Sequence, residues 1–415
     1  METLRFLMVT TFYPPYHLGG DAVHVQYLAR ALAARGHEVH VEFSPAAYGL
    51  KRKENGTPPS DSEDGVLLHP IPGDGWGAPV AAHLLGRSGS VRRFHTQLLD
   101  RVRPEIVHHH NISLLGLDVL QPRRDARALY TAHDYWVLCP RSDLFKYGRY
   151  PCDTPTCLRC SLVSGRPPQL WRYGRSWRGL PGVDCAIAPS AYMARTIRTT
   201  MGCPVVHIPN FAPDSDPDPG AGGSGGYFLF VGVLETHKGV SELVAASGRK
   251  EFPIRIVGRG SLYEPLRHLA ETRADGLRVE GWVSRDRLLE LYRGARALVI
   301  PSLWPENAPL AAVEAMSCGT PLLVSRRGGL EELLHGGATG FSFEPDADGI
   351  LGAIDRFEGT GNPSVLRMGA RSAYERFHHP EAYLRTYLDV VRGDVPDGGA
   401  DDPAPEGTAP TVGLS

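Results

Sequence analysis

The sequence predicts an α/β protein with two doubly wound halves, each a parallel sheet covered by helices. Short runs rich in β-branched residues alternate with helical patterns along most of the chain, as in a parallel sheet wound with helices. The Pro-, Gly-, Asp- and Ser-rich stretch at residues 211–226 interrupts this alternation near the middle. The chain of 415 residues also exceeds the roughly 250–300 at which a single core stops growing.

The first half, residues 1–210, begins with a strand and an amphipathic helix. Val25, Leu28, Ala29 and Leu32 recur at helical spacing, and Gly36 follows as a stop signal. One face of this helix is therefore expected to pack on the sheet. The predicted strands of this half are LRFLMVT, EVHVEF, IVHHH, ALYTAH, CAIAPS and VVHIPN.

The second half, residues 227–375, repeats the alternation after a flexible linker at 211–226. Its predicted strands are YFLFVGV, IRIVG, LRVEGWV, ALVIPS, PLLVS and GFSF. A C-terminal helix is expected at 376–392. The tail at 393–415 is too polar and too rich in Pro and Gly to fold by itself.

Composition excludes several functional classes. Hydrophobic residues make up 42% of the chain, charged residues 22%, and the net charge is −2, so no global field attracts nucleic acid. The apolar run at the N-terminus is too short for a signal peptide, and no window approaches the roughly 20 apolar residues of a membrane span. Seven cysteines, an odd number, favour the reducing cytoplasm over a disulfide framework.

Two carboxylates, Glu306 and Glu314, lie near the start of a predicted helix. Asn307 is the expected cap and Pro309 suits the first turn, which leaves the N–H groups of Leu310 and Ala311 as an anion site. A helical rise puts the carboxylates on the order of 12 Å apart, wider than the roughly 5–9.5 Å of pairs that hydrolyse glycosides. A diphosphate with hydroxyls at both ends, as in a nucleotide-sugar, would fit this arrangement.

Taken alone, such glutamates are more often a complement to the helix dipole and a surface charge. Other features support a ligand site. Lys238-Gly239 opens a helix after a strand, where phosphates bind in open α/β sheets. Arg259 lies in a second glycine turn, and Gly19-Gly20 lets a phosphate approach the backbone before the first helix.

These residues resemble the family 4 retaining glycosyltransferases of GT-B architecture. The resemblance runs from Gly19-Gly20 through PEIVHHHN, YTAHD, PNF, KG and VEGWV to the E-x7-E element. It implies two Rossmann-like doubly wound domains that face an interdomain cleft, an acceptor-side N-terminal domain and a C-terminal domain that binds a nucleoside-diphosphate sugar.

The resemblance also implies a role for each matching residue. Glu306 would hold hydroxyls of the transferred sugar, Glu314 the ribose hydroxyls and Lys238 the diphosphate. His133 would touch the donor sugar near the reacting centre. The remaining implied donor-binding residues are Gly19, Gly20, Asn307, Ala308, Pro309 and Leu310.

One position departs from the family pattern. The family commonly has an arginine directly after the glycine of the strand that precedes Lys-Gly, and this chain has Val233 there. Either Arg259 replaces the missing cation or the donor is held more weakly. His133 also has a plain interpretation, as a satisfied histidine at the end of a strand.

The implied reaction needs no enzymic nucleophile. Lys238 and the helix N-terminus would stabilise the leaving diphosphate, whose oxygen takes the acceptor proton on the same face. No catalytic cofactor is expected, and DSDPDPG is interpreted as a solubilising part of the linker rather than as a metal site.

The cysteines at 139–160 form the one candidate metal site. Cys139, Cys152, Cys157 and Cys160 are separated by 12, 4 and 2 residues, which suits a structural zinc site as well as it suits reduced thiols, and an iron–sulfur cluster or a disulfide less well. His108, His109 and His110 are interpreted as a strand end, because adjacent strand residues point to opposite faces.

The arginine- and tryptophan-rich segment at 166–180 could rest on an anionic membrane or cover the first domain, and we favour packing because Pro and Gly interrupt it. No sequence motif identifies the hydroxyl acceptor, which could be a glycan, a lipid or a small metabolite. Residues that could line its site are Tyr13, Tyr16, His17, His24, Trp76 and Tyr135.

The leading hypothesis is therefore a retaining, metal-independent glycosyltransferase. A nucleotide-sugar epimerase or hydrolase of the same fold would need acids placed to remove a ring proton or to activate water, which the wide glutamate spacing does not suggest. A non-catalytic sugar-binding scaffold is favoured only by Val233.

Overall fold

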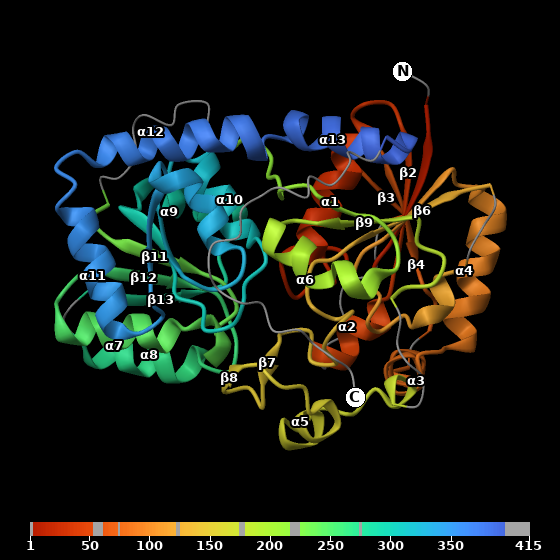
Figure 1. Ribbon diagram of the computed structural model, residues 1–415, viewed down its shortest axis with the longest axis horizontal. Coiled ribbons are helices and arrows are strands. Elements are labelled where there is room, and N and C mark those ends of the chain that lie inside the picture. The colour runs from red at the N-terminus through yellow and green to blue at the C-terminus, as the bar shows by residue number, and fades with distance from the viewer. Residues whose placement is uncertain are drawn as a thin grey trace. The chain divides into compact units, whose positions relative to one another are not determined.

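The computed structural model describes residues 3–52, 61–73, 75–121, 125–173, 179–215, 225–273 and 276–394. It divides into two compact units (Figure 1). Unit 1 comprises Met1–Leu144, Asp153–Ile208 and Arg385–Ser415, and unit 2 comprises Phe145–Cys152 and Pro209–Leu384. The chain passes between the units at residues 208 and 209, close to the predicted boundary at 210, but neither unit is one uninterrupted segment. Residues 216–224 of the predicted linker and 395–415 of the predicted tail lie outside the described residues.

Unit 1 is built on a sheet whose strand order is β10-β9-β6-β5-β1-β2-β4-β3. The pairs are parallel except for the antiparallel pair of β3 and β4 at one edge. The predicted strands are confirmed, and β3 and β4 were not predicted. The bounds are β1 (Arg5–Val9), β2 (Glu38–Phe43), β3 (Ser62–Glu63), β4 (Val66–Pro70), β5 (Ile106–His109), β6 (Arg127–Thr131), β9 (Cys185–Ala188) and β10 (Val205–His207).

The helices of unit 1 follow the amphipathic pattern. Helix α1 (Gly20–Ala33) buries Val25, Leu28, Ala29 and Leu32, which confirms the predicted apolar face. The other helices are α2 (Pro45–Arg52), α3 (Gly77–Leu85), α4 (Gly89–Val102), α5 (Cys157–Val163) and α6 (Ala191–Met201), with short 3-10 turns η1 (Leu117–Val119) and η2 (Leu170–Arg172).

Unit 2 contains a fully parallel sheet whose strand order is β13-β12-β11-β14-β15-β16. Its strands are β11 (Phe228–Val231), β12 (Ile254–Val257), β13 (Leu277–Gly281), β14 (Ala297–Ile300), β15 (Leu322–Ser325) and β16 (Gly340–Phe343), all of them predicted. The alternating helices are α7 (Val240–Arg249), α8 (Tyr263–Thr272), α9 (Arg285–Gly294), α10 (Leu310–Ser317), α11 (Ala347–Glu358) and α12 (Pro363–Ala373). Phe228, Ile254, Val299 and Leu323 belong to the buried core around this sheet.

The chain ends in a helix that begins later than predicted. A π-helical turn (Tyr374–His378) leads to His379, whose extended backbone breaks the helix, and α13 (Pro380–Arg392) follows. The prediction of a continuous helix over 376–392 was therefore wrong in its first turn. The small hairpin of β7 (Phe145–Lys146) and β8 (Tyr150–Pro151) was not predicted. Among the described helices, none is long and apolar enough to cross a bilayer.

Candidate active site

The site in unit 2 lies where the sheet order reverses. The chain leaves β11 toward β12 on one side and later returns to β14 on the other side, and open α/β sheets bind ligands at the carboxyl ends of such a strand pair. The turn after β11 continues through the 3-10 turn η4 (Thr236–Lys238), which ends in Lys238. The segment after β14 carries Glu306 toward α10. The topology therefore places both predicted residues at one switch point.

Lys238 and Glu306 form an ion pair in which the carboxylate is buried and the ammonium is partly buried. The Nζ of Lys238 donates to Oε1 of Glu306 at 2.6 Å. The hydroxyl of Ser302 and the indole N–H of Trp304 donate to the same oxygen, each at 2.8 Å. Among the described residues these are the side-chain hydrogen bonds of this carboxylate, and all fall on Oε1, which leaves Oε2 available for a ligand.

The carboxylate of Glu306 keeps its charge in spite of its burial. Burial alone raises its pKa, but the Lys238 ammonium and the donors from Ser302 and Trp304 outweigh burial, so the pKa is lowered from its usual value. Lys238 also lies over the ring of Trp304, with Nζ 4.7 Å from the ring centroid. The site therefore presents a fixed negative oxygen beside a fixed cation.

Glycines fix the backbone on both sides of this pair. Gly239 has φ +70°, and a Cβ there would lie 1.8 Å from the carbonyl oxygen of Pro301. Gly328 has φ +66°, and its Cβ would lie 2.0 Å from the carbonyl oxygen of Glu306, which also accepts the N–H of Gly329 at 2.8 Å. Only glycine combines this conformation with so close an approach.

The start of α10 differs from the prediction. The helix begins at Leu310, and Pro309 occupies the cap position with extended backbone, φ −65° and ψ 129°. The prediction that Asn307 caps the helix and that Pro309 lies in its first turn was therefore wrong. The first N–H groups, on Leu310 and Ala311, still have no acceptor within the helix. Asn210 holds the preceding loop by donating to the carbonyl of Ala308 at 2.7 Å.

Glu314 lies on α10 and is buried. Its Oε1 accepts a guanidinium N–H of Arg285 at 3.0 Å, and its Oε2 accepts the hydroxyl of Tyr292 at 3.3 Å. Both partners lie on α9. These two contacts orient the carboxylate of Glu314 from α9.

Val233 and Arg259 lie on turns that touch each other. The N–H of Leu234 donates to the carbonyl of Arg259 at 3.0 Å, and a Cβ at Gly258 would lie 1.8 Å from the carbonyl oxygen of Gly232. The exposed Arg259 side chain covers the ring of Tyr263 at 4.9 Å. A cation thus stands one strand away from Val233, as the sequence suggested.

Unit 1 has its own switch point, between β1 and β5, and histidines gather there. His110 Nδ1 and His133 Nε2 are 3.0 Å apart, and the rings of His108 and His110 are 4.0 Å apart. The ring of His24 is 5.2 Å from that of His133. The prediction that the histidine run does not converge was wrong for His108 and His110, because residues two apart on a strand share a face.

Burial keeps this histidine cluster neutral. It lowers the pKa of His133 and of His109 to about 4 and lowers the pKa values of His24, His108 and His110 well below the usual range. Nε2 of His110 is buried and has no hydrogen-bond partner among the described residues. An unpaired buried donor is costly, so the favoured tautomer carries the proton on Nδ1, which donates to Nε2 of His133.

The remaining residues expected near the donor and acceptor differ in how deeply they are buried. Gly19 precedes α1 in extended conformation, and Gly20 is its first residue. Tyr13 and Tyr16 are buried against Phe43, at 5.7 and 6.2 Å between ring centroids. His24 and Tyr135 are also buried, whereas His17 is half-buried and Trp76 is 51% exposed.

Structural zinc at Cys139, Cys152, Cys157 and Cys160, an alternative to reduced thiols in the sequence, stays a prediction. None of the seven cysteines forms a disulfide, and within the described ranges no group of three or more His, Cys, Asp or Glu side chains is arranged to hold a metal. Burial, with the nearby Asp143, raises the pKa of Cys139 to about 11.

The described part of the segment 166–180 packs on unit 1, as favoured from the sequence. Trp171 donates its indole N–H to the carbonyl of His83 at 3.2 Å. The guanidinium of Arg172 lies over the rings of Trp136 and Trp171, at 5.0 and 4.6 Å. Residues 174–178 lie outside the described ranges.

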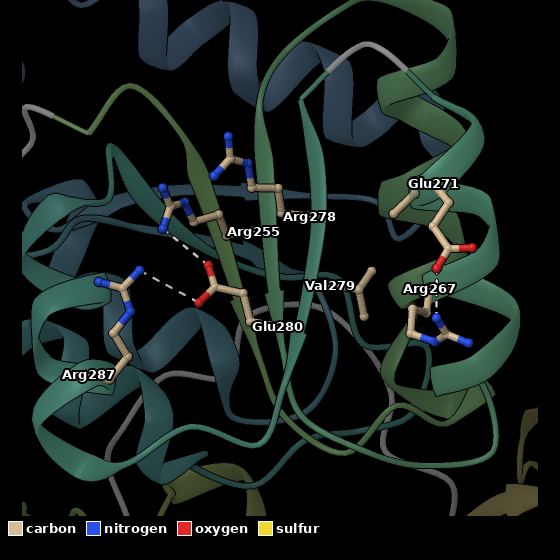
Figure 2. A pocket seen from close by; sticks show the side chains of 8 residues that line it. Arg255, Arg267, Glu271, Arg278, Val279, Glu280 and Arg287 are labelled. Atoms are coloured by element: carbon tan, nitrogen blue, oxygen red, sulfur yellow. Dashed lines mark hydrogen bonds and ion pairs between the residues drawn. The ribbon is translucent and has the colours of Figure 1, made fainter.

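A pocket of about 490 Å³ lies at the edge of the unit 2 sheet, and none of the predicted site residues lines it. Figure 2 shows Glu280 between Arg255 and Arg287, with Arg278 beside them. Ion pairs already join most of these charges, so we assign the pocket no ligand.

Sequence reasoning missed several residues of the site. Ser302 and Trp304 flank Glu306 closely, so their proximity was a usable signal. Arg285 and Tyr292 reach Glu314 through packing of α9 beside α10, which no spacing in the sequence reveals.

Comparison with known proteins identifies the class. A model described as Glycosyl transferases group 1 matches residues 213–371, and a model described as Glycosyltransferase Family 4 matches residues 18–215. Together the models cover most of the chain. The protein has the GT-B fold and resembles the family 4 type of glycosyltransferases.

Individual relatives agree with this assignment. Glycogen synthase of Mycobacterium tuberculosis is 29% identical over 94% of this chain and 96% of its own. D-inositol 3-phosphate glycosyltransferase of Acidothermus cellulolyticus is 31% identical over 51% of this chain and 47% of its own. Among solved structures, sucrose-phosphate synthase from Thermosynechococcus elongatus has a TM-score of 0.72 at 18% identity and covers 94% of this chain and 98% of its own. An Anabaena protein in complex with UDP and glucose has a TM-score of 0.64 at 15% identity, over 94% of this chain and all of its own (100%).

Proposed function

We propose that this glycosyltransferase moves a sugar from a nucleoside-diphosphate sugar to a hydroxyl acceptor with retention of anomeric configuration, and that its catalysis needs no metal ion. The observation that carries the proposal is the Lys238–Glu306 pair at the unit 2 switch point, with Oε2 of the carboxylate left for a ligand. The relative solved with UDP and glucose supports this class of donor.

Each residue has a distinct role in the proposed reaction. Oε2 of Glu306 accepts hydroxyls of the transferred sugar, and Glu314 accepts the ribose hydroxyls. Lys238, with Arg259 and the N-terminus of α10, stabilises the charge that develops on the leaving diphosphate. His133, held neutral by burial, touches the donor sugar. The leaving phosphate oxygen receives the acceptor proton, so no enzymic nucleophile takes part.

Calorimetric titration with uridine, guanosine, adenosine and thymidine diphosphates and their sugars tests the donor site. One nucleotide is expected to bind at micromolar strength, and Glu314→Ala is expected to lose at least about 1–2 kcal/mol of binding through a lost charged hydrogen bond. The matched control is Glu331→Ala, a half-exposed glutamate near the same sheet edge, which should bind as wild type.

The outcome then separates a transferase from a scaffold. Release of the nucleoside diphosphate from the bound donor, with product of unchanged anomeric configuration by NMR, supports the proposal. A folded protein that binds no nucleotide, or that binds one without turnover across glycan, lipid and small-metabolite acceptors, would overturn it. We place the enzyme in the reducing cytoplasm, which agrees with seven cysteines outside disulfides.

A further inference from the structure

Unit 1 exposes large apolar side chains on three neighbouring elements. Leu158, Leu162 and Val163 of α5 are 46%, 60% and 63% exposed, and Leu85 of α3 and Leu170 of η2 are 58% and 52% exposed. Single exposed leucines are ordinary, but exposed apolar residues grouped on one face mark a contact surface.

Direct contacts join these elements. The N–H of Trp171 in η2 donates to the carbonyl of His83 in α3, and His83 Nε2 lies 2.9 Å from the carbonyl oxygen of Pro167. A side-chain hydrogen bond joins Tyr173, directly after η2, to Ser161 of α5. We call the surface formed by α3, α5 and η2 the α3–α5 face.

The α3–α5 face is basic, although the whole chain has a net charge of −2. Arg87, Arg159 and Arg166 are exposed, although Arg166 also pairs with the buried Asp143 at 3.9 Å, and Asp153 is the one acidic residue in the segments 76–87 and 153–173. Lys51 at the end of α2 adds to this charge. Burial first, and then the positive charge of Arg166, lower the pKa of Lys51, so like charges approach one another here. An anionic partner would relieve their repulsion.

We propose that the α3–α5 face docks on the surface of an anionic lipid bilayer. Leucine and valine side chains that protrude from a helix can enter the acyl boundary, while Arg87, Arg159 and Lys51 reach the headgroups. Trp76 and Tyr173, both exposed on this face, have the amphipathic rings that favour the bilayer interface. The bilayer needs no groove, and it matches both the apolar side chains and the surrounding charge. This inference is independent of the proposed donor site.

Flotation of the full-length protein with lipid vesicles tests the proposal without donor or acceptor. Vesicles that mix phosphatidylglycerol with phosphatidylcholine are expected to bind the protein, and vesicles of phosphatidylcholine alone at least about tenfold less. Raised salt should weaken the binding. Leu158→Ser/Leu162→Ser and Arg87→Glu/Arg159→Glu should each reduce binding at least about tenfold.

Matched controls lie in other exposed positions. Val365→Ser/Met368→Ser changes two exposed apolar residues of α12, and Arg278→Glu/Arg385→Glu reverses two exposed charges elsewhere; both should bind as wild type. All four changes are at exposed sites, and melting temperatures verify folding. Absence of binding to anionic vesicles, or equal loss in the controls, would overturn the proposal. If vesicle binding falls in the arginine variant but not in the leucine variant, bilayer docking is also overturned, and a soluble anionic partner is favoured.

Discussion

Glu306 shows how a buried carboxylate can stay charged and still keep one oxygen without a side-chain partner among the described residues. Three donors converge on one oxygen and compensate the cost of burial, while the second oxygen remains unused by the described residues. Removing one member of a buried ion pair is far more costly than removing both, because the remaining charge has no partner.

Lys238→Met is therefore expected to destabilise the protein by about 3–5 kcal/mol, measured by denaturant unfolding. The double variant Lys238→Met/Glu306→Gln should regain most of this stability, because a neutral amide replaces the unpaired charge. Neither variant should bind the donor in calorimetry. If Lys238→Met is as stable as the wild type, the pair is not buried as described.

If His133 touches the donor sugar as proposed, His110 is expected to position its ring, because His110 Nδ1 lies 3.0 Å from His133 Nε2. Replacing His110 with Phe keeps a ring beside His108 but removes the hydrogen bond to His133 Nε2. We expect kcat to fall by about tenfold or more, in line with the loss of an orienting group, with little change in KM for the donor. The ¹⁵N shifts of the His133 ring should also change tautomeric pattern. His268→Phe, at an exposed histidine on α8, is the control, and equal kcat in both variants would remove this role.

Sequence reasoning was strongest at the residue scale where chemistry and strand position coincide. Lys238, Glu306 and Glu314 were found because each follows a strand of the sheet at a spacing typical of the family. His110 was dismissed because adjacent histidines were considered together rather than in alternation. The spacing of the four cysteines between residues 139 and 160 suits structural zinc as well as reduced thiols, and it could not decide between them because ligand placement depends on packing.

At the scale of elements, the loops that carry the site depend on backbone contacts that only glycine allows. Gly328 and Gly239 each bring a loop against the neighbouring segment at a positive φ. Such turns fix the direction in which Lys238 and Glu306 leave their strands.

Gly328→Ala is expected to displace Glu306 and to abolish activity, with a stability loss of about 1–3 kcal/mol. Gly336→Ala is a matched control, because Gly336 has a similar φ of +72° but nothing within 4 Å of a Cβ. It should show the backbone strain without the clash, and therefore a smaller stability loss and near-normal donor binding. Equal loss of binding in both variants would contradict the role given to the close approach.

Element boundaries were the least predictable feature. Pro309 was expected inside α10, but its extended backbone places it just outside, and this choice depends on the loop tied by Asn210. Strand β4 escaped prediction because VLLHP is short, although pairing with β2 makes it a regular parallel strand.

At the scale of the whole molecule, the buried histidines couple stability to pH. The lowered pKa values mean that the unfolded chain binds more protons than the folded one below about pH 6.5, so stability should fall as pH falls from there toward 4. For His109 alone, a pKa of about 4 corresponds to about 3 kcal/mol. Asp134 acts in the opposite direction, because burial raises its pKa to about 7.

Urea unfolding at a series of pH values tests this coupling. The free energy of unfolding should decrease by several kcal/mol between about pH 7 and about pH 5, since five histidines outweigh one carboxylate. A control variant, His268→Asn, should leave the slope unchanged. A flat profile would show that the histidines titrate normally in the folded protein.

The fold class was predictable because alternating strand and helix patterns suffice for two parallel sheets. Which chain segments make up each unit was not predictable, since that depends on contacts between residues far apart in sequence. His108, on β5, bonds the hydroxyl of Tyr387 on α13 at 2.9 Å, and nothing near either residue in the sequence indicates that pairing.

The division of α13, whose residues through Leu384 belong to unit 2 and whose residues from Arg385 belong to unit 1, constrains how such proteins can exchange parts. A chimera that takes its first 208 residues from a relative would inherit a foreign partner for its own C-terminal helix. A functional chimera therefore needs two junctions, one between residues 208 and 209 and one within α13. The segment from Arg385 onward must then come from the same parent protein as the rest of unit 1.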